Sequence, residues 1–111
     1  MIESIALEKS PASAEEAQSL LAAAADPVRW RLLGELAAAG TRCVCDLQPI
    51  AAVAPNVLSY HLKVLREAGL VTATKRGRWV DYRLAEDAHD RLRAALPTAQ
   101  LATAALSGGA C

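Results

Sequence analysis

The 111-residue sequence has no long apolar run, no net charge and only two histidines. No stretch of about 18 or more apolar residues occurs, so no transmembrane helix is expected. Residues 1–10 carry Glu3 and Glu8 where a secretory signal would be basic. No nucleophile has an evident base partner, which disfavours an enzyme. With 53% hydrophobic residues, the chain is expected to form one cytoplasmic domain with a real core.

The sequence has three cysteines, an odd number, so they cannot all pair within one chain. In a reducing compartment, thiols serve more often in metal binding or redox chemistry, or stay inert, than in a disulfide framework. Disulfide scaffolding is therefore not expected.

The zero net charge argues against a nucleic-acid binder of the globally basic kind, but the charges are separated along the chain. Residues 1–26 hold five acidic side chains against one lysine, whereas residues 59–83 hold six basic side chains against two acidic ones. The basic charge therefore lies in one segment, where a nucleic acid would be bound.

Helix-capping signals organise the first half of the chain. Residues 1–12 lack periodicity and predict a flexible arm. Ser13 and Glu16 have the spacing of a capping box and predict a helix from residue 14 to about residue 24. Asp26-Pro27 predicts the start of a second helix, which Gly40 ends.

A short helix and a longer one are predicted next, separated by a turn. The short helix spans residues 45–52, with Pro49 either in its first turn or kinking it. The longer helix begins at Pro55 and ends at Gly69. A turn of a few residues between two helices is typical of a helix-turn-helix.

After Gly69 the sequence pattern changes from helical to strand-like. Residues 70–74 and 79–84 are rich in β-branched and aromatic residues and flank residues 75–78, a pattern that predicts a β-hairpin wing. Residues 86–105 return to helical composition, with a kink or break at Pro97. The predicted fold is mainly α with a small β-hairpin, a winged helix-turn-helix in the order α-α-α-α-β-β-α. Residues 13–106 form the DNA-binding and dimerisation domain, and residues 107–111 form a flexible tail.

Four short motifs together carry a family resemblance. Residues 26–33 read D-P-V-R-W-R-L-L, residues 43–47 C-V-C-D-L, residues 59–71 S-Y-H-L-K-V-L-R-E-A-G-L-V, and residues 77–84 G-R-W-V-D-Y-R-L. The sequence resembles the ArsR/SmtB family of winged-helix, metal-sensing repressors over about residues 20–84. The resemblance implies a homodimer, joined through its first and last helices, that binds a palindromic operator and releases it on metal binding.

The predicted DNA contacts lie on the fourth helix and on the wing. Hydrogen bonds to base edges or phosphates are expected from Asn56, Ser59, Tyr60 and Lys63, and backbone or minor-groove contacts from Lys75, Arg76 and Arg78. His61 lies on the apolar side of its helix, so packing is at least as strongly indicated as base contact. Ala54 stands where the family usually has a capping serine, which weakens the helix start.

Thiols supply the predicted effector site. Cys43 and Cys45 form a C-x-C pair, and thiolates select thiophilic centres: As(III) or Sb(III), with Cd(II) or Pb(II) as further candidates. Position 48, a third cysteine in one branch of the family, is Gln48, which leaves Cys111 as the candidate third ligand. Residues two apart on a regular helix diverge by about 200°, so a shared ion requires the third helix to start unwound.

Several alternatives stay open. The same fold suits a thiol-redox repressor, a ligand-independent repressor, or a sensor of another transition metal such as nickel or zinc. The family's second metal site, on the last helix, is not expected here, because Ala99 and Ala102 stand where later ligands would fall. His89 is expected to be a surface residue.

Overall fold

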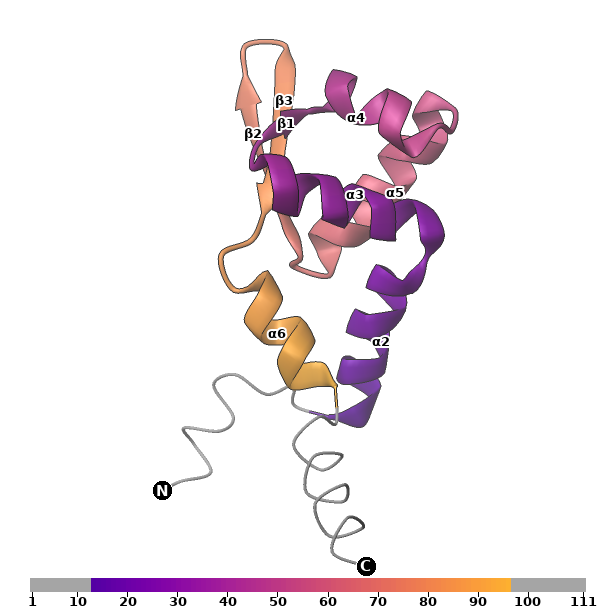
Figure 1. Cartoon of the computed structure of the whole chain (residues 1–111), viewed down its shortest axis with the longest axis vertical. Coiled ribbons are helices and arrows are strands. Elements are labelled where there is room, and N and C mark those ends of the chain that lie inside the picture. The colour runs from indigo at the N-terminus through magenta and orange to yellow at the C-terminus, as the bar shows by residue number, and fades with distance from the viewer. Residues whose placement is uncertain (1–12, 97–111) are drawn as a thin grey trace, which may run out of the picture.

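A computed structural model describes residues 13–96. Its elements follow in the order α2 (Ala14–Ala25), α3 (Pro27–Ala39), β1 (Arg42–Cys43), α4 (Val44–Ala51), α5 (Pro55–Glu67), β2 (Val71–Arg76), β3 (Trp79–Leu84) and α6 (Ala88–Ala95). Figure 1 shows α3 crossing the middle of the molecule, the β2–β3 hairpin projecting at one end, and α2 and α6 converging at the other. This is the predicted winged helix-turn-helix.

The helix boundaries follow from capping groups. The Ser13 hydroxyl accepts from the backbone N–H of Glu16 at 3.1 Å, and Asp26 Oδ1 accepts from the N–H groups of Val28 and Arg29. Gly40, with φ of 90°, ends α3 and donates its N–H to the Leu36 carbonyl. Each of these groups satisfies a backbone polar atom that a helix end leaves unpaired. The predicted boundaries of α2 and α3 are confirmed to within a residue.

Leucines hold the helices together. The largest fully buried side chains come from α3, α4, α5 and the turn that follows α5: Leu32, Leu36, Leu47, Leu58, Leu65 and Leu70. They form one continuous core, which fixes the helix-turn-helix against α3. No helix within residues 13–96 is long and apolar enough to cross a membrane.

The sheet has one strand more than predicted. The wing strands β2 and β3 pair antiparallel from Val71↔Leu84 to Arg76↔Trp79, and Gly77 makes their turn with φ of 62°. The short strand β1 pairs with the other edge of β3, giving the order β1-β3-β2. A two-residue strand has no periodicity of its own, so the sequence could not reveal it.

Two further details refine the predictions. Pro49 lies inside α4 beyond its first turn, so the first-turn placement was wrong. The last helix begins at Ala88 rather than residue 86. The predicted arm, tail and Pro97 break lie outside the described residues, as do Ala99 and Ala102.

Candidate metal centre and DNA-binding surface

The cysteine pair sits where β1 ends and α4 begins. Cys43 has extended backbone angles (φ −75°, ψ 161°) and is the N-cap of α4, whereas Cys45 lies within its first turn. The two side chains can therefore meet, because only one of them belongs to the regular helix. A shared ion at this pair stays a prediction, and it calls for one cysteine to lie outside the regular helix, as Cys43 does.

The sulfurs of Cys43 and Cys45 are joined in a disulfide, with their Cα atoms 5.3 Å apart. The bridge joins the end of β1 to the first turn of α4, two residues further along the chain, so it ties only adjacent elements. Disulfide scaffolding was not expected, and this bridge is local. A disulfide sulfur has no thiolate to offer, and only the reduced pair can act as metal ligands. The site therefore has two chemical states.

Asp46 brings a third donor to the pair. The sulfurs of Cys43 and Cys45 and a carboxylate oxygen of Asp46 lie within 4.8 Å of one another, and Cys45 and Asp46 are exposed. This is the one cluster of three or more metal-ligating side chains between residues 13 and 96. Soft sulfur combined with carboxylate oxygen suits thiophilic ions of borderline hardness.

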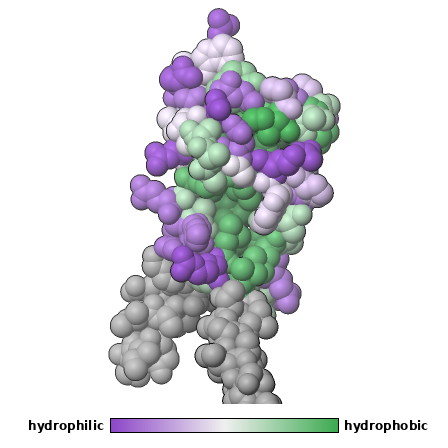
Figure 2. Space-filling model, in the orientation of Figure 1, coloured by the Kyte–Doolittle hydropathy of each residue, from purple (hydrophilic) through white to green (hydrophobic). Residues whose placement is uncertain are grey.

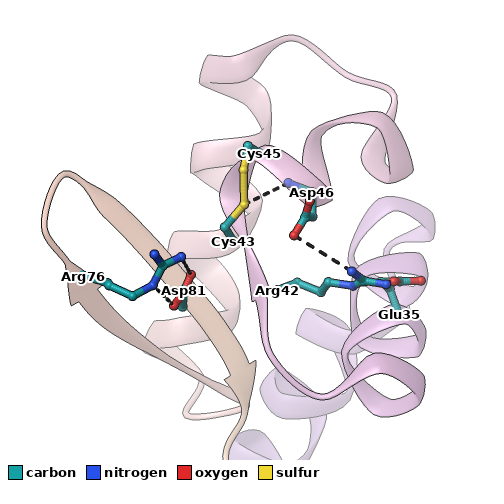
Figure 3. Close-up of polar contacts among 7 residues, drawn as sticks. All are labelled: Glu35, Arg42, Cys43, Cys45, Asp46, Arg76 and Asp81. Carbon is teal, nitrogen blue, oxygen red and sulfur yellow. Dashed lines mark hydrogen bonds and ion pairs between the residues drawn. A yellow bond between two sulfur atoms is a disulfide. The ribbon is translucent and has the colours of Figure 1, made fainter.

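The cluster is also tied to its surroundings through polar contacts (Figure 3). The Asp46 N–H donates to Cys43 Sγ at 3.3 Å. The Asp46 carboxylate lies 3.9 Å from Arg42 Nη1, and Arg42 Nε donates to Glu35 Oε2 at 2.9 Å. Arg42 thus joins the cysteine site to α3 by ion pairs.

The structure describes Gln48 but not Cys111, the two residues considered for the third-ligand position. The Gln48 amide donates to the Val53 carbonyl in the turn between α4 and α5, so its structural role is to hold that turn. Cys111, the predicted third ligand, lies outside the described residues. Sequence reasoning missed Asp46, although its position directly after Cys45 was a usable signal.

The predicted DNA-contacting side chains of α5 share one exposed face. Asn56, Ser59, Tyr60 and Lys63 are all exposed, with Tyr60 59% accessible. The opposite face of the helix is buried and includes Leu58, Leu62 and Leu65. This separation leaves a polar helix surface available to the major groove.

His61 does not belong to that surface. It is buried, and Arg29 Nη1 lies 2.9 Å from its Nδ1. Because a guanidinium only donates, this bond requires an unprotonated Nδ1. Asp26 Oδ1 lies 3.9 Å from the same nitrogen, and Arg29 Nε donates to the Ala23 carbonyl. The packing role expected for His61 is confirmed, and the residue joins α5 to the start of α3.

Asp26 is electrostatically adapted to this joint. Burial by itself would raise the pKa of its carboxyl. The N–H groups of Arg29 and Val28, together with the charge of Arg29, outweigh burial and hold the pKa below its ordinary value. The ionised carboxylate is therefore the form that this joint favours.

The start of α5 has no side-chain cap. Ala54 occupies the N-cap position and makes no side-chain hydrogen bond there, as the sequence predicted. Pro55 at the first helical position limits the loss, because proline has no N–H to satisfy.

The three predicted wing cations differ in their surroundings. Lys75 and Arg78 are exposed, and the Arg78 guanidinium carbon lies 6.0 Å from the Trp79 ring centroid. Arg76 instead donates through Nε and Nη2 to the two carboxylate oxygens of Asp81, at 2.8 and 3.1 Å. The hydrogen bonds and charge of Arg76 hold the pKa of Asp81 below its ordinary value. Asp81 was not predicted as a site residue; the hairpin register would have paired it diagonally with Arg76.

The last helix carries acidic and histidine side chains near its start. His89 is exposed, and Arg93 Nη2 lies 3.3 Å from its Nε2 one turn further along α6. This confirms His89 as a surface helix residue.

Comparison with known proteins places these features in a family. Residues 26–73 match the helix-turn-helix model described as "Bacterial regulatory protein, arsR family". The chain is 43% identical over 65 residues to the arsenical resistance operon repressor of Bacillus subtilis (strain 168), covering 59% of this chain and 62% of that protein. The chain thus spans under two thirds of this relative's length.

Solved structures agree with the sequence match. A crystal structure described as a possible transcriptional regulator for arsenical resistance is 41% identical, with a TM-score of 0.64, covering 68% of this chain and 78% of that one. A homodimeric winged helix-turn-helix DNA-binding domain from Mycobacterium bovis is 26% identical, with a TM-score of 0.62, covering 85% and 84%. These relatives are transcriptional regulators, in agreement with the prediction that the chain is not an enzyme. The chain belongs to the ArsR/SmtB family of winged-helix transcriptional regulators.

Proposed function

We propose that this protein is a metal(loid)-responsive transcriptional repressor that binds operator DNA and releases it when a thiophilic ion binds Cys43 and Cys45. The observation that carries the proposal is the convergence of these two sulfurs with the Asp46 carboxylate at the start of α4. Since α4 is the first helix of the helix-turn-helix, a ligand bound there acts on the DNA-binding unit itself.

Trivalent arsenic or antimony is the favoured effector, with Cd(II) and Pb(II) as the other candidates. Arsenite reacting with the reduced pair forms two As–S bonds, and two hydroxyl groups leave as water with the thiol protons. The third hydroxyl either stays on the arsenic or is exchanged for Asp46 or Cys111, and in that exchange it too leaves as water once protonated. The names of the relatives, which refer to arsenical resistance, support the arsenic assignment.

The DNA-binding half of the proposal rests on α5 and the wing. We propose that Asn56, Ser59 and Tyr60 contact base edges. The DNA backbone or the minor groove is contacted by Lys63, Lys75, Arg76 and Arg78. One winged helix covers only a few base pairs, so specific recognition calls for two half-sites about one helical turn apart.

A homodimer supplies the two half-sites in this proposal, and it acts in the cytoplasm. The helices α2 and α6 pack against each other, and Figure 2 shows apolar residues gathered in this part of the molecule. Apolar side chains left partly or fully exposed here include Ala17 and Leu21 of α2, Leu92 of α6 and Leu96, the C-cap of α6. The homodimeric relative from Mycobacterium bovis supports dimerisation by analogy.

The energy required is modest. To lower operator occupancy by two decades, the ion must favour the DNA-incompetent form by about 2.7 kcal/mol, within the usual range of allosteric coupling. Binding of a soft ion by thiolates supplies more than this.

A thiol-redox repressor is the second candidate, and the Cys43–Cys45 disulfide favours it. Hydrogen peroxide would take two electrons and two protons from the thiol pair, forming the disulfide and two molecules of water. Under this hypothesis the disulfide-bonded protein is the DNA-incompetent form, and no ion is needed.

One titration separates the two candidates. The protein, reduced with a phosphine, is bound to a fluorescently labelled operator duplex in metal-free buffer, and anisotropy is followed as arsenite, Cd(II) or peroxide is added. Release by an ion under reducing conditions supports the metal sensor. Release by peroxide alone supports the redox repressor, and retention of DNA under all conditions rejects both.

A further inference from the structure

The cysteine site is connected by backbone pairing to the wing. Cys43 ends β1, and its partner across the β1–β3 ladder is Asp81. The same Cys43 caps α4 through its sulfur. A change in the position of Cys43 therefore acts on the helix-turn-helix through α4 and on the wing through β3.

Asp81 in turn orients a wing cation. Its carboxylate is 19% exposed and accepts both bonds of a two-point contact from Arg76, whose side chain is 63% exposed. Two parallel bonds fix the plane of a guanidinium as well as its position. Arg76 Nη1 takes no part in either bond, so the group keeps a donor for a phosphate.

Figure 3 shows the disulfide where β1 meets α4, and the Arg76–Asp81 contact across the strands of the neighbouring hairpin. The connection from thiol to wing cation thus passes through a single residue. By contrast, Lys75 and Arg78 have no bond to this carboxylate among the contacts of the described chain.

We propose that Asp81 is a positioning residue that holds Arg76 ready for a DNA phosphate and passes ion binding at Cys43 on to this contact. When Cys43 binds an ion, its sulfur no longer accepts the Asp46 N–H that caps α4, and β1 shifts against β3. Asp81 then loses its alignment with Arg76, and the wing contact weakens together with the helix-turn-helix. This relay rests on the proposed ion-sensing function, whereas the positioning of Arg76 requires only DNA binding.

Asp81→Asn tests the positioning in the full-length reduced protein. Removing a negative charge near DNA would by itself tighten binding, so a weaker complex is diagnostic. We expect operator affinity to fall about fivefold, the effect of losing an aligned charge-assisted contact. Equal or tighter binding by Asp81→Asn would overturn the proposal.

A double-mutant cycle with Arg76→Ala distinguishes positioning from general wing stability. If Asp81 acts through Arg76, then Asp81→Asn has no further effect on DNA affinity in the Arg76→Ala background. In the matched Lys75→Ala background the full effect of about fivefold should persist. Equal losses in all backgrounds would show that Asp81 only stabilises the hairpin.

The relay is tested by the ratio of operator affinities without and with arsenite. We expect Asp81→Asn to reduce this ratio about threefold or more relative to wild type. Arsenite binding itself should not change: the arsenite concentration that protects the Cys43 and Cys45 thiols from reaction with a chromogenic disulfide should equal that of wild type. An unchanged ratio would reject the relay but leave the sensing function standing. Failure of wild type to release DNA would reject the sensing function, and the cycle above would still decide the positioning of Arg76.

Discussion

The starts of α3 and α4 are both capped by the side chain of the preceding residue, yet the two caps differ in strength. Asp26 offers a carboxylate oxygen that accepts from Val28 and Arg29 at 2.8 and 3.2 Å. Cys43 offers sulfur, a weak acceptor, at 3.3 Å from the Asp46 nitrogen. The first cap stabilises α3 permanently, whereas the second can be given up at small cost.

The surroundings of the two caps agree with this difference. Asp26 lies beside buried His61 and half-buried Arg29, in a joint between α3 and α5. Cys43 lies beside exposed Cys45 and Asp46, where an ion can reach it. The same helix-turn-helix therefore has one fixed attachment and one that ligand chemistry can alter.

The largest expected effect is on sensing. Cys43→Ser and Cys45→Ser should each keep operator binding but require over about 100-fold more arsenite or Cd(II) for release, because a hydroxyl lacks the soft thiolate. Cys43→Ser should also equal or exceed wild type in stability, since serine is a good N-cap. Anisotropy titrations and urea unfolding check both points.

This prediction contradicts the metal-sensor proposal if both variants release DNA at wild-type concentrations of every thiophilic ion. Val28→Ala, which removes side-chain volume packed against the core at the start of α3, serves as the control for nonspecific effects on the fold.

The second effect is on stability. Asp26→Ala should lower the free energy of unfolding by about 1–2 kcal/mol, because it removes the α3 cap and the acidic partner of the joint. The affinity ratio without and with arsenite should stay within about twofold of wild type, since this cap takes no part in sensing. Urea unfolding and the anisotropy titration measure the two quantities.

Asp26→Ser is the matched control, because serine restores the cap but not the charge. A loss of ion response in Asp26→Ala without a loss of stability would show that the two attachments are not separate.

The caps also explain how much the sequence could predict. Ser13, Asp26 and Gly40 act on backbone groups a few residues away, so their helices were predicted correctly. The strand β1 depends on β3, about 40 residues further along, and the bond between Arg76 and Asp81 depends on the exact register of the hairpin. The strand β1 is set by tertiary pairing alone, whereas the Arg76–Asp81 bond follows from the hairpin once its register is known.

The candidate site shows the same division. The C-x-C spacing identifies Cys43 and Cys45 as candidate ligands, and helical periodicity predicts the exposed face of α5. The burial of His61 was favoured by its apolar neighbours, but its bond to Arg29 joins residues 32 positions apart. Such contacts require the packed structure.

A third cap offers a gain in stability. Ala54 has the extended backbone angles of an N-cap, φ −62° and ψ 151°, but no side-chain acceptor. Ala54→Ser should raise the free energy of unfolding by about 0.5–1 kcal/mol by accepting an N–H of the first turn of α5. Ala54→Val is the control of larger volume without an acceptor, and equal stability of the two variants in urea would refute the capping explanation.

The smallest expected effect concerns the charge of Asp26 alone. Asparagine caps a helix about as well as aspartate, so Asp26→Asn isolates the carboxylate's electrostatic contribution. Because the folded pKa of Asp26 lies below its ordinary value, this contribution is fully present above the ordinary pKa of about 3.9 and is lost as pH falls through the folded pKa. Wild type should therefore exceed Asp26→Asn in stability near neutral pH, and the difference should shrink below about pH 4. Urea unfolding at pH 7, 5 and 3.5 measures it. A difference that is constant over this range would mean that the Asp26 carboxylate stabilises the joint only as a hydrogen-bond acceptor, like the cap at Cys43, and not through its charge.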